Sequence, residues 1–392
     1  MRNPQQTIIL ATGFAMFSMF FGAGNIVFPL AMGQHTESMI PFAFMGLLIT
    51  AVGVPFMGLI AMTLYDGDYK EFFARLGIWP GFVLSAIIMG LIGPFGAIPR
   101  CITLAYSTAH MYFPGISLPV FSIISCCAIF SLTYKKNKLL DILGYVLTPF
   151  LLLTLTIIIV KGLLESQHMP QSTFSPLPVF FYGFNEGYKT MDLLGAFFFS
   201  SVVIAGLKND LNATSSKQDS SALIKVAIKA SVLGAILLAI VYAGFSAIAA
   251  YNGSLLEPLP KDEMIGVLSR NILGQYAGFI ATVCVALATL TTAMALSSVF
   301  AEFLHKDVAL GKIGYIPSLL VTLVIAFFVS TLHFTGIAQF LEPILQVCYP
   351  SMIVLSAANL CYKLFGFKPV KSLVFGTLAL TIAIYGAVLY LG

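Results

Sequence analysis

Long apolar segments follow one another along almost the whole chain and restrict its fold more than any other feature. A membrane-spanning helix needs about 20 mostly apolar residues, and a helix satisfies its own backbone groups in lipid. The segments lack the alternation of a membrane barrel. They predict an all-α polytopic membrane protein with about 11 transmembrane helices. The expected spans are 7–32, 40–63, 81–111, 115–133, 139–164, 190–207, 223–251, 275–300, 314–332, 338–362 and 371–391.

The composition excludes an ordinary soluble protein. Hydrophobic residues make up 59% of the 392 residues and charged residues only 9%, whereas soluble domains carry about 25% charged residues. The net charge of +4 comes with no basic stripe, so no nucleic-acid partner is expected. The six cysteines and five histidines are scattered without metal-ligand spacing, and no catalytic constellation appears, so we expect neither a cofactor nor an enzyme.

The basic residues predict the orientation. With the N-terminus in the cytoplasm, 15 of the 20 Lys and Arg residues fall inside, four fall outside and Arg100 lies within a span. This bias agrees with the positive-inside rule. We therefore expect a multi-pass protein of a bacterial cytoplasmic (inner) membrane, surrounded by the lipid bilayer.

An inverted repeat is the expected organisation. Five helices per unit is an odd number, so the second unit would start from the opposite side of the membrane, as in many transporters. The expected parts are a first five-helix repeat (1–165), an extracytoplasmic loop (166–189), a second five-helix repeat (190–365) and an additional helix (366–392).

The first span contains the strongest signal for a broken helix. Gly22, Ala23, Gly24 and Asn25 precede Pro29, and glycine and proline both weaken a helix interior. A break would free N–H groups that suit a carboxylate and carbonyl groups that suit a cation. Close packing of helices through small residues remains the alternative.

Two further spans carry hydroxyl groups. Ser200 and Ser201 follow three phenylalanines in the sixth span, where they either sustain an unwound stretch or bond back to the previous turn. Thr289, Thr291 and Thr292 lie within one turn of the eighth span. Such a density of oxygen atoms suits a hard cation, although back-bonding explains it equally well.

Ionisable residues near the spans are candidates for function. Arg100 lies in a kinked, Gly- and Pro-rich stretch of the third span, Asp192 opens the sixth span, and Glu342 stands at the outer end of the tenth. Arg100 needs a counter-charge or a route to water. We interpret the three as a candidate gate in which Asp192 or Glu342 pairs with Arg100; snorkelling to the interface is the alternative.

An ordered set of motifs resembles the bacterial branched-chain amino acid:cation symporter (LIVCS) family. The segment 20–29 (FFGAGNIVFP) is similar to the first-helix signature of that family. The runs 93–100 (GPFGAIPR), 187–192 (GYKTMD), 290–293 (LTTA), 343–345 (PIL) and 349–350 (YP) resemble later ones. Family members are usually drawn with twelve helices, so the count of eleven departs from the pattern at a terminus outside the ten-helix core.

The resemblance implies a LeuT-like fold with two inverted five-helix repeats, broken helices 1 and 6, and an extra C-terminal helix. It implies Na⁺-coupled import of leucine, isoleucine or valine by alternating access. The implied substrate site comprises backbone groups at Gly22, Ala23, Gly24 and Asn25 for the carboxylate, and Phe198, Phe199, Ser200 and Ser201 for the amino group. The implied Na⁺ site comprises Ser18, Phe21, Ala288, Thr291 and Thr292.

Other functions remain open at this point. A transporter of the same fold could carry another small amino acid or solute, or couple to H⁺ in place of Na⁺. An ion channel is the alternative from another class, but no carbonyl-rich filter motif or acidic ring is visible.

Overall fold

The computed structural model describes residues 4–134, 139–166, 168–214 and 220–391, and over these residues it consists of helices without strands. The first half of the chain forms α1 (Pro4–Phe20), α2 (Ala23–Thr36), the 3₁₀ helix η1 (Glu37–Met39), α3 (Ile40–Leu48), the π-helix η2 (Ile49–Gly53), α4 (Val54–Thr63), α5 (Tyr69–Ala74), α6 (Ile78–Ile92), α7 (Ala97–His110), α8 (Leu118–Thr133) and α9 (Leu139–Glu165). The second half forms α10 (Pro176–Lys189), α11 (Asp192–Thr214), α12 (Ser220–Tyr251), α13 (Gly253–Leu256), α14 (Met264–Phe303), the π-helix η3 (Leu304–Val308), α15 (Tyr315–Ser330), α16 (His333–Phe365) and α17 (Val370–Leu391).

Each predicted span coincides with a helix or with helices joined end to end. Among the described residues, six helical stretches are long and apolar enough to cross a membrane by length and composition, or seven when α10 and α11 count as one span bent by 41°. The helices α8 and α15 are apolar but shorter. An all-α membrane protein is thus confirmed, while the number of eleven spans stays a prediction.

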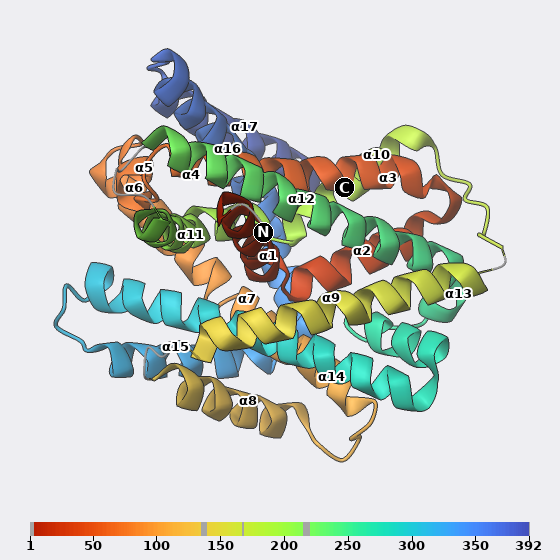
Figure 1. The fold of residues 1–392 in the computed structure, drawn as a ribbon. Helices are drawn as coiled ribbons and strands as arrows, with labels where there is room; N and C mark the ends of the chain where they lie inside the picture. Colours follow the sequence, from red (N-terminus) through yellow and green to blue (C-terminus); the bar gives the residue numbers. More distant parts are fainter. Residues whose placement is uncertain (1–3, 135–138, 167, 215–219, 392) are drawn as a thin grey trace.

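One correction concerns the segment 166–189, which was expected to be a loop. Its residues 176–189 form α10, which begins after Ser175 with Pro at its first turn. Helix α10 packs along α3 and continues at a bend into α11 (Figure 1). The sixth span therefore starts earlier than the apolar pattern indicates.

Two broken spans and their partners form one group of helices. Helices α1 and α2 pack on α12, while α10 and α11 pack on α3 and α4. These contacts are close: a Cβ atom at Gly33 would lie 2.0 Å from the carbonyl oxygen of Ser246, and one at Gly183 would lie 1.9 Å from that of Ala43. The first span thus contacts the seventh as the sixth contacts the second, which is the pairing that a five-helix repeat predicts.

A second group of helices lies beside the first. Helix α14 packs on α7, α8, α9 and α15, and α15 also contacts α8. In Figure 1, α8, α14 and α15 lie in the lower part of the view, with α3, α10 and α12 above them. Helix α17 packs along α16. In repeat order, the third and fourth spans pack with the eighth and ninth, again as equivalent pairs.

The short helix α5 connects the two groups at one end of the bundle. Asp68 caps it by accepting the N–H groups of Lys70 and Glu71, at 2.8 and 3.2 Å. The Tyr69 phenol donates to Asp307 in η3, and its ring packs against Phe198 of α11. Burial, and the hydrogen bond with Asp307, raise the pKa of Tyr69, so the phenol stays protonated and can donate.

Candidate functional site

A cavity of about 50 Å³ lies where three broken spans meet. The breaks separate α1 from α2, α6 from α7, and α10 from α11. Apolar side chains form much of its wall: Met19, Phe20, Ile92, Met191, Phe199 and Leu296. Backbone groups from helix ends and a few polar side chains complete it. This combination is typical of binding sites for small molecules in membrane transporters.

The break in the first span confirms the prediction made from the glycine cluster. Phe21 and Gly22 lie outside the helices, and Gly22 has an extended backbone. Asn25 N–H donates to the Gly22 carbonyl at 3.2 Å, and Gly22 N–H donates to Asn25 Oδ1 at 2.9 Å. Ala23 and Gly24 begin α2, so their N–H groups have no carbonyl one turn earlier to bond. These two N–H groups lie at the positive end of a helix beside the cavity.

The break in the sixth span is not where the sequence indicated. Helix α11 runs without interruption through 197–203, and Ser200 and Ser201 donate back to the carbonyl groups of Phe197 and Phe198, at 3.0 and 2.7 Å. Of the two alternatives that the sequence left open at these serines, back-bonding to the previous turn is the one observed. Phe199 still lines the cavity, whereas Phe198, Ser200 and Ser201 do not.

The observed break lies at Thr190 and Met191. Met191 has a φ of 64°, a left-handed backbone that residues other than glycine rarely adopt. A Cβ atom at Gly24 would lie 3.1 Å from the Cα atom of Thr190. The start of α2 therefore packs directly on the break between α10 and α11. No glycine or proline marks this break, and the Asp that opens α11 is the signal that the sequence offered.

Asp192 is the centre of a buried hydrogen-bond network. Its Oδ2 atom accepts from Asn25 Nδ2 at 2.6 Å and from the Tyr242 hydroxyl at 3.1 Å, and Asn25 also donates to Tyr242. Nearby, the Tyr349 hydroxyl accepts the N–H of Leu193 at 3.1 Å. Neither tyrosine was singled out from the sequence, because a lone Tyr in an apolar helix usually only packs. Asn25 thus links the break in the first span to the break in the sixth.

Arg100 binds a backbone group, which corrects the predicted gate. Its Nη1 atom donates to the carbonyl oxygen of Lys189 at 2.9 Å and to Met191 Sδ at 3.3 Å. Among the ion pairs of the described residues, none joins Arg100 to Glu342 or Asp192. The negative end of α10 takes the place of the carboxylate that the sequence suggested.

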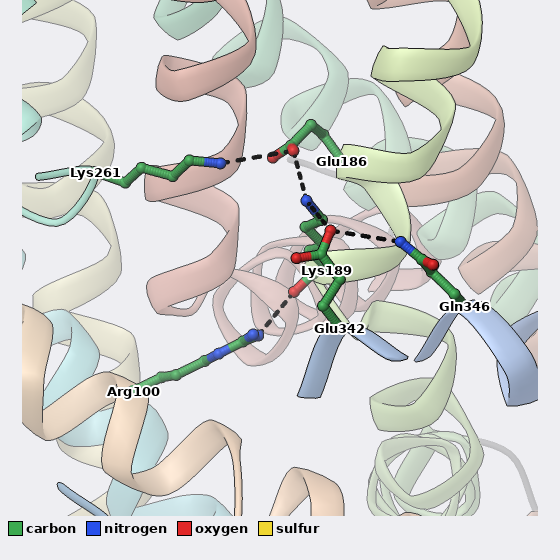
Figure 2. Close-up of polar contacts among 6 residues, drawn as sticks. All are labelled: Arg100, Glu186, Lys189, Lys261, Glu342 and Gln346. Atoms are coloured by element: carbon green, nitrogen blue, oxygen red, sulfur yellow. Dashed lines mark hydrogen bonds and ion pairs between the residues drawn. The ribbon is translucent and has the colours of Figure 1, made fainter. Parts of the chain in front are cut away.

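Glu342 belongs to a chain of charges above this contact, shown in Figure 2. Lys189 Nζ lies 2.7 Å from Glu342 and 2.8 Å from Glu186, and Lys261 lies 3.6 Å from Glu186. Gln346 donates to Glu342 at 3.5 Å. We call the residues Glu186, Lys189, Lys261 and Glu342 the charged cluster. It joins α10, α16 and the segment after α13.

The residues of the predicted cation site lie close together, and the Thr291 and Thr292 hydroxyl groups both donate back to the Ala288 carbonyl. Thr292 Oγ1 lies 3.4 Å from the carbonyl oxygen of Phe21 and 3.1 Å from that of Ala288. Thr291 Oγ1 lies 2.8 Å from the same Ala288 oxygen. Ser18 lies in the last turn of α1, where carbonyl groups lack a partner one turn later. The carbonyl oxygen of Phe21 at the break thus lies near three oxygen atoms of α14, those of Ala288, Thr291 and Thr292. Oxygen atoms are the ligands that hard cations prefer.

The cavity brings together part of the predicted site. Eight predicted residues line it: Gly22, Ala23, Gly24, Asn25, Phe199, Asp192, Arg100 and Thr292. Thr190, Met191 and Cys101 line it too, although none was predicted.

Comparison with known proteins identifies the family. Residues 5–390 match the family described as "Branched-chain amino acid transport protein". The chain belongs to this family. The branched-chain amino acid permease BraB of Bacillus subtilis (strain 168) is 30% identical over 373 residues, covering 92% of this chain and 81% of that protein. The permease BrnQ of the same organism is 29% identical over 381 residues, covering 94% and 84%. Members of the branched-chain amino acid transport family are transporters, so this chain is a multi-pass membrane transporter and not an enzyme.

Solved structures confirm the fold. The inward-facing conformation of Mhp1 aligns with a TM-score of 0.60 and 14% identity, covering 97% of this chain and 91% of that one. MhsT in complex with L-phenylalanine aligns with a TM-score of 0.57 and 14% identity, covering 94% and 98%. The branched-chain amino acid transport family member described here therefore has the LeuT-like fold that the sequence resemblance implied.

Proposed function

We propose that this protein imports leucine, isoleucine or valine by Na⁺ symport through alternating access. The observation that carries the proposal is the cavity in which the ends of two broken helices meet an apolar wall. A branched aliphatic side chain needs apolar surroundings, and a zwitterion needs polar anchors. The names of BraB and BrnQ support branched-chain amino acids as the substrate class.

The α-carboxylate is best placed at the start of α2. The N–H groups of Ala23 and Gly24 have no carbonyl partner one turn earlier, and that of Ala23 donates to the Cys101 thiol, a weak acceptor that a carboxylate would replace. The N–H groups of Gly22 and Asn25 are used within the break. A helix N-terminus favours an anion through its N–H groups and its dipole. The aliphatic side chain would then lie against Met19, Phe199 and Leu296.

Na⁺ is proposed to bind between α1 and α14. The Thr292 hydroxyl oxygen lies 3.4 Å from the carbonyl oxygen of Phe21 and 3.1 Å from that of Ala288, so these groups offer three neutral oxygen ligands. Phe21 lies two residues before Ala23, the first residue whose N–H group is assigned to the substrate. Ion and substrate would therefore stabilise the same geometry of the break. A gradient can drive uptake only when the two ligands favour the conformations differently, and such a shared element couples them.

Uptake of labelled leucine into proteoliposomes tests the proposal. With an inward Na⁺ gradient we expect uptake that unlabelled isoleucine and valine compete away and that alanine and lysine do not. Uptake driven by a pH gradient and indifferent to Na⁺ would keep the substrate class and overturn the cation site. Single-channel current without saturable uptake would overturn transport by alternating access. The proposed orientation, with the N-terminus in the cytoplasm of a bacterial inner membrane, is tested by labelling single cysteines at residues 2 and 261 from each side.

A further inference from the structure

Asp192 places a buried carboxyl group at the cavity wall without a cationic partner among the described residues. The residue is 5% exposed and lines the cavity wall. Its partners Asn25 and Tyr242 are neutral, and so is Thr190 beside it. Among the ion pairs of the described residues, none includes Asp192. A buried carboxylate is costly unless a positive charge accompanies it.

The basic residues Arg100 and Lys189 near the cavity contact groups other than Asp192. Arg100 lines the same cavity, but its guanidinium donates to the Lys189 carbonyl and to Met191 Sδ. Lys189 points into the charged cluster, where it pairs with Glu186 and Glu342, as Figure 2 shows. In this conformation, therefore, neither Arg100 nor Lys189 supplies a positive charge to Asp192.

The position of Asp192 relative to the start of α2 fits an α-amino acid. Asn25 contacts both places, because its Oδ1 accepts from Gly22 N–H and its Nδ2 donates to Asp192. The Asn25 side chain therefore spans from the backbone at the start of α2 to the Asp192 carboxylate. In an α-amino acid a single carbon atom carries both the carboxylate and the ammonium group, so its two anchors must be close neighbours.

We propose that Asp192 binds the α-ammonium group of the transported amino acid and thereby selects α-amino acids over analogues that lack this group. The inference rests on the proposed function, since it assumes that a branched-chain amino acid occupies the cavity. It assigns the ammonium group to Asp192 in place of the groups at 198–201 that the family resemblance implied, because α11 is continuous there. Asn25 and Tyr242 act as positioning residues, because their hydrogen bonds to Oδ2 orient the carboxylate.

Competition binding to the purified full-length protein tests the proposal. The two competitors are leucine and 2-hydroxy-4-methylpentanoate, which keeps the carboxylate and side chain but has a hydroxyl group in place of the ammonium group. The wild type should prefer leucine. Asp192→Asn should weaken leucine binding roughly 10- to 100-fold, the usual effect of losing a charged hydrogen bond, and leave the affinity for the hydroxy acid within about threefold. The ratio of the two affinities is the readout, since a general defect of folding lowers both.

Two further variants sharpen the test. Asp192→Glu keeps the charge, so it should keep the preference for leucine even if both affinities fall, and it also serves if Asp192→Asn does not fold. Asp262→Asn is the matched control, because Asp262 is a buried aspartate that accepts from Ser107 outside the cavity. That variant should leave the ratio unchanged.

The opposing outcomes are distinct. The inference is overturned, while the proposed function stands, if Asp192→Asn loses affinity equally for leucine and for the hydroxy acid, or if it loses no affinity for leucine. A preference for leucine that persists in Asp192→Asn while Na⁺ dependence disappears assigns the carboxylate to the ion and also overturns it. A wild type that binds no leucine overturns the proposed function and the inference with it.

Discussion

The Arg100 guanidinium donates a hydrogen bond of 2.9 Å to the carbonyl oxygen of Lys189, the last residue of α10. The carbonyl groups at a helix C-terminus lack partners and carry partial negative charge. Arg100 supplies both a donor and a positive charge from α7, a helix of the other group. The contact therefore joins the two groups of helices directly beside the cavity.

Arg100→Gln should lower leucine uptake on the order of tenfold, because it removes a charged donor from the end of α10. Arg100→Lys should retain part of the activity, since it keeps the charge but loses the planar, multiply donating group. Arg75→Gln is the control, as Arg75 lies over the Tyr362 ring away from the cavity. Initial uptake rates in proteoliposomes decide the matter, and wild-type rates in Arg100→Gln would contradict the assigned role.

The stability that the charged cluster gives the protein should depend more on Glu186 than on Glu342. Glu186 is 1% exposed and pairs with Lys189 and Lys261, whereas Glu342 is 38% exposed. Removing one partner of a buried pair costs up to about 3–5 kcal/mol, while exposed pairs contribute about 0–1 kcal/mol. Glu186→Gln should lower Tm clearly and Glu342→Gln only slightly, measured in detergent. The reverse order would show that the exposed carboxylate is the important one.

Thr292→Val should abolish or strongly weaken the stimulation of uptake by Na⁺. The substitution keeps the shape of the side chain but removes the hydroxyl oxygen near the carbonyl groups of Phe21 and Ala288. Thr289→Val is a matched control on the same helix, because Thr289 is buried and bonds back to the Ala286 carbonyl. The Na⁺ concentration for half-maximal uptake is the measurement. Equal shifts in the two variants would remove Thr292 from the cation site.

Gly183→Ala should destabilise the protein through the contact of α10 with α3. A Cβ atom there would lie 1.9 Å from the Ala43 carbonyl oxygen, and overpacking of this kind costs about 1–3 kcal/mol or more. Gly206→Ala provides the contrast, because no atom lies within 4 Å of the added Cβ atom in α11. That change should be neutral or stabilising by up to about 1 kcal/mol, as alanine is the better helix former. In thermal unfolding, the Tm of Gly183→Ala should fall, whereas the Tm of Gly206→Ala should rise or stay the same.

Much of the fold could be predicted because the bilayer restricts it. Apolar length implied helices, and the glycine cluster implied the break at Gly22, since glycine weakens a helix wherever it stands. The motifs implied the fold, which the solved structures confirm. The eight predicted residues that line the cavity follow from these features and from the family resemblance.

The position of the break in the sixth span could not be predicted from the sequence, because contacts with other helices impose it. Thr190 and Met191 contain no helix breaker, yet Arg100 caps the carbonyl end of α10 and Tyr349 caps the N–H of Leu193. Ser200 and Ser201 left an interruption open, but their hydroxyl groups donate to the carbonyl groups of their own previous turn.

The sequence by itself determined a bundle of membrane helices with a broken first span, because hydrophobic length and glycine content act locally. Only the tertiary structure decided the partners of the polar groups. It gave Arg100 a backbone carbonyl in place of Glu342, and it brought Asn25 and Asp192, 167 positions apart, within 2.6 Å. The reason is physical: a buried polar group must find a partner, and which group lies within reach depends on how distant helices pack.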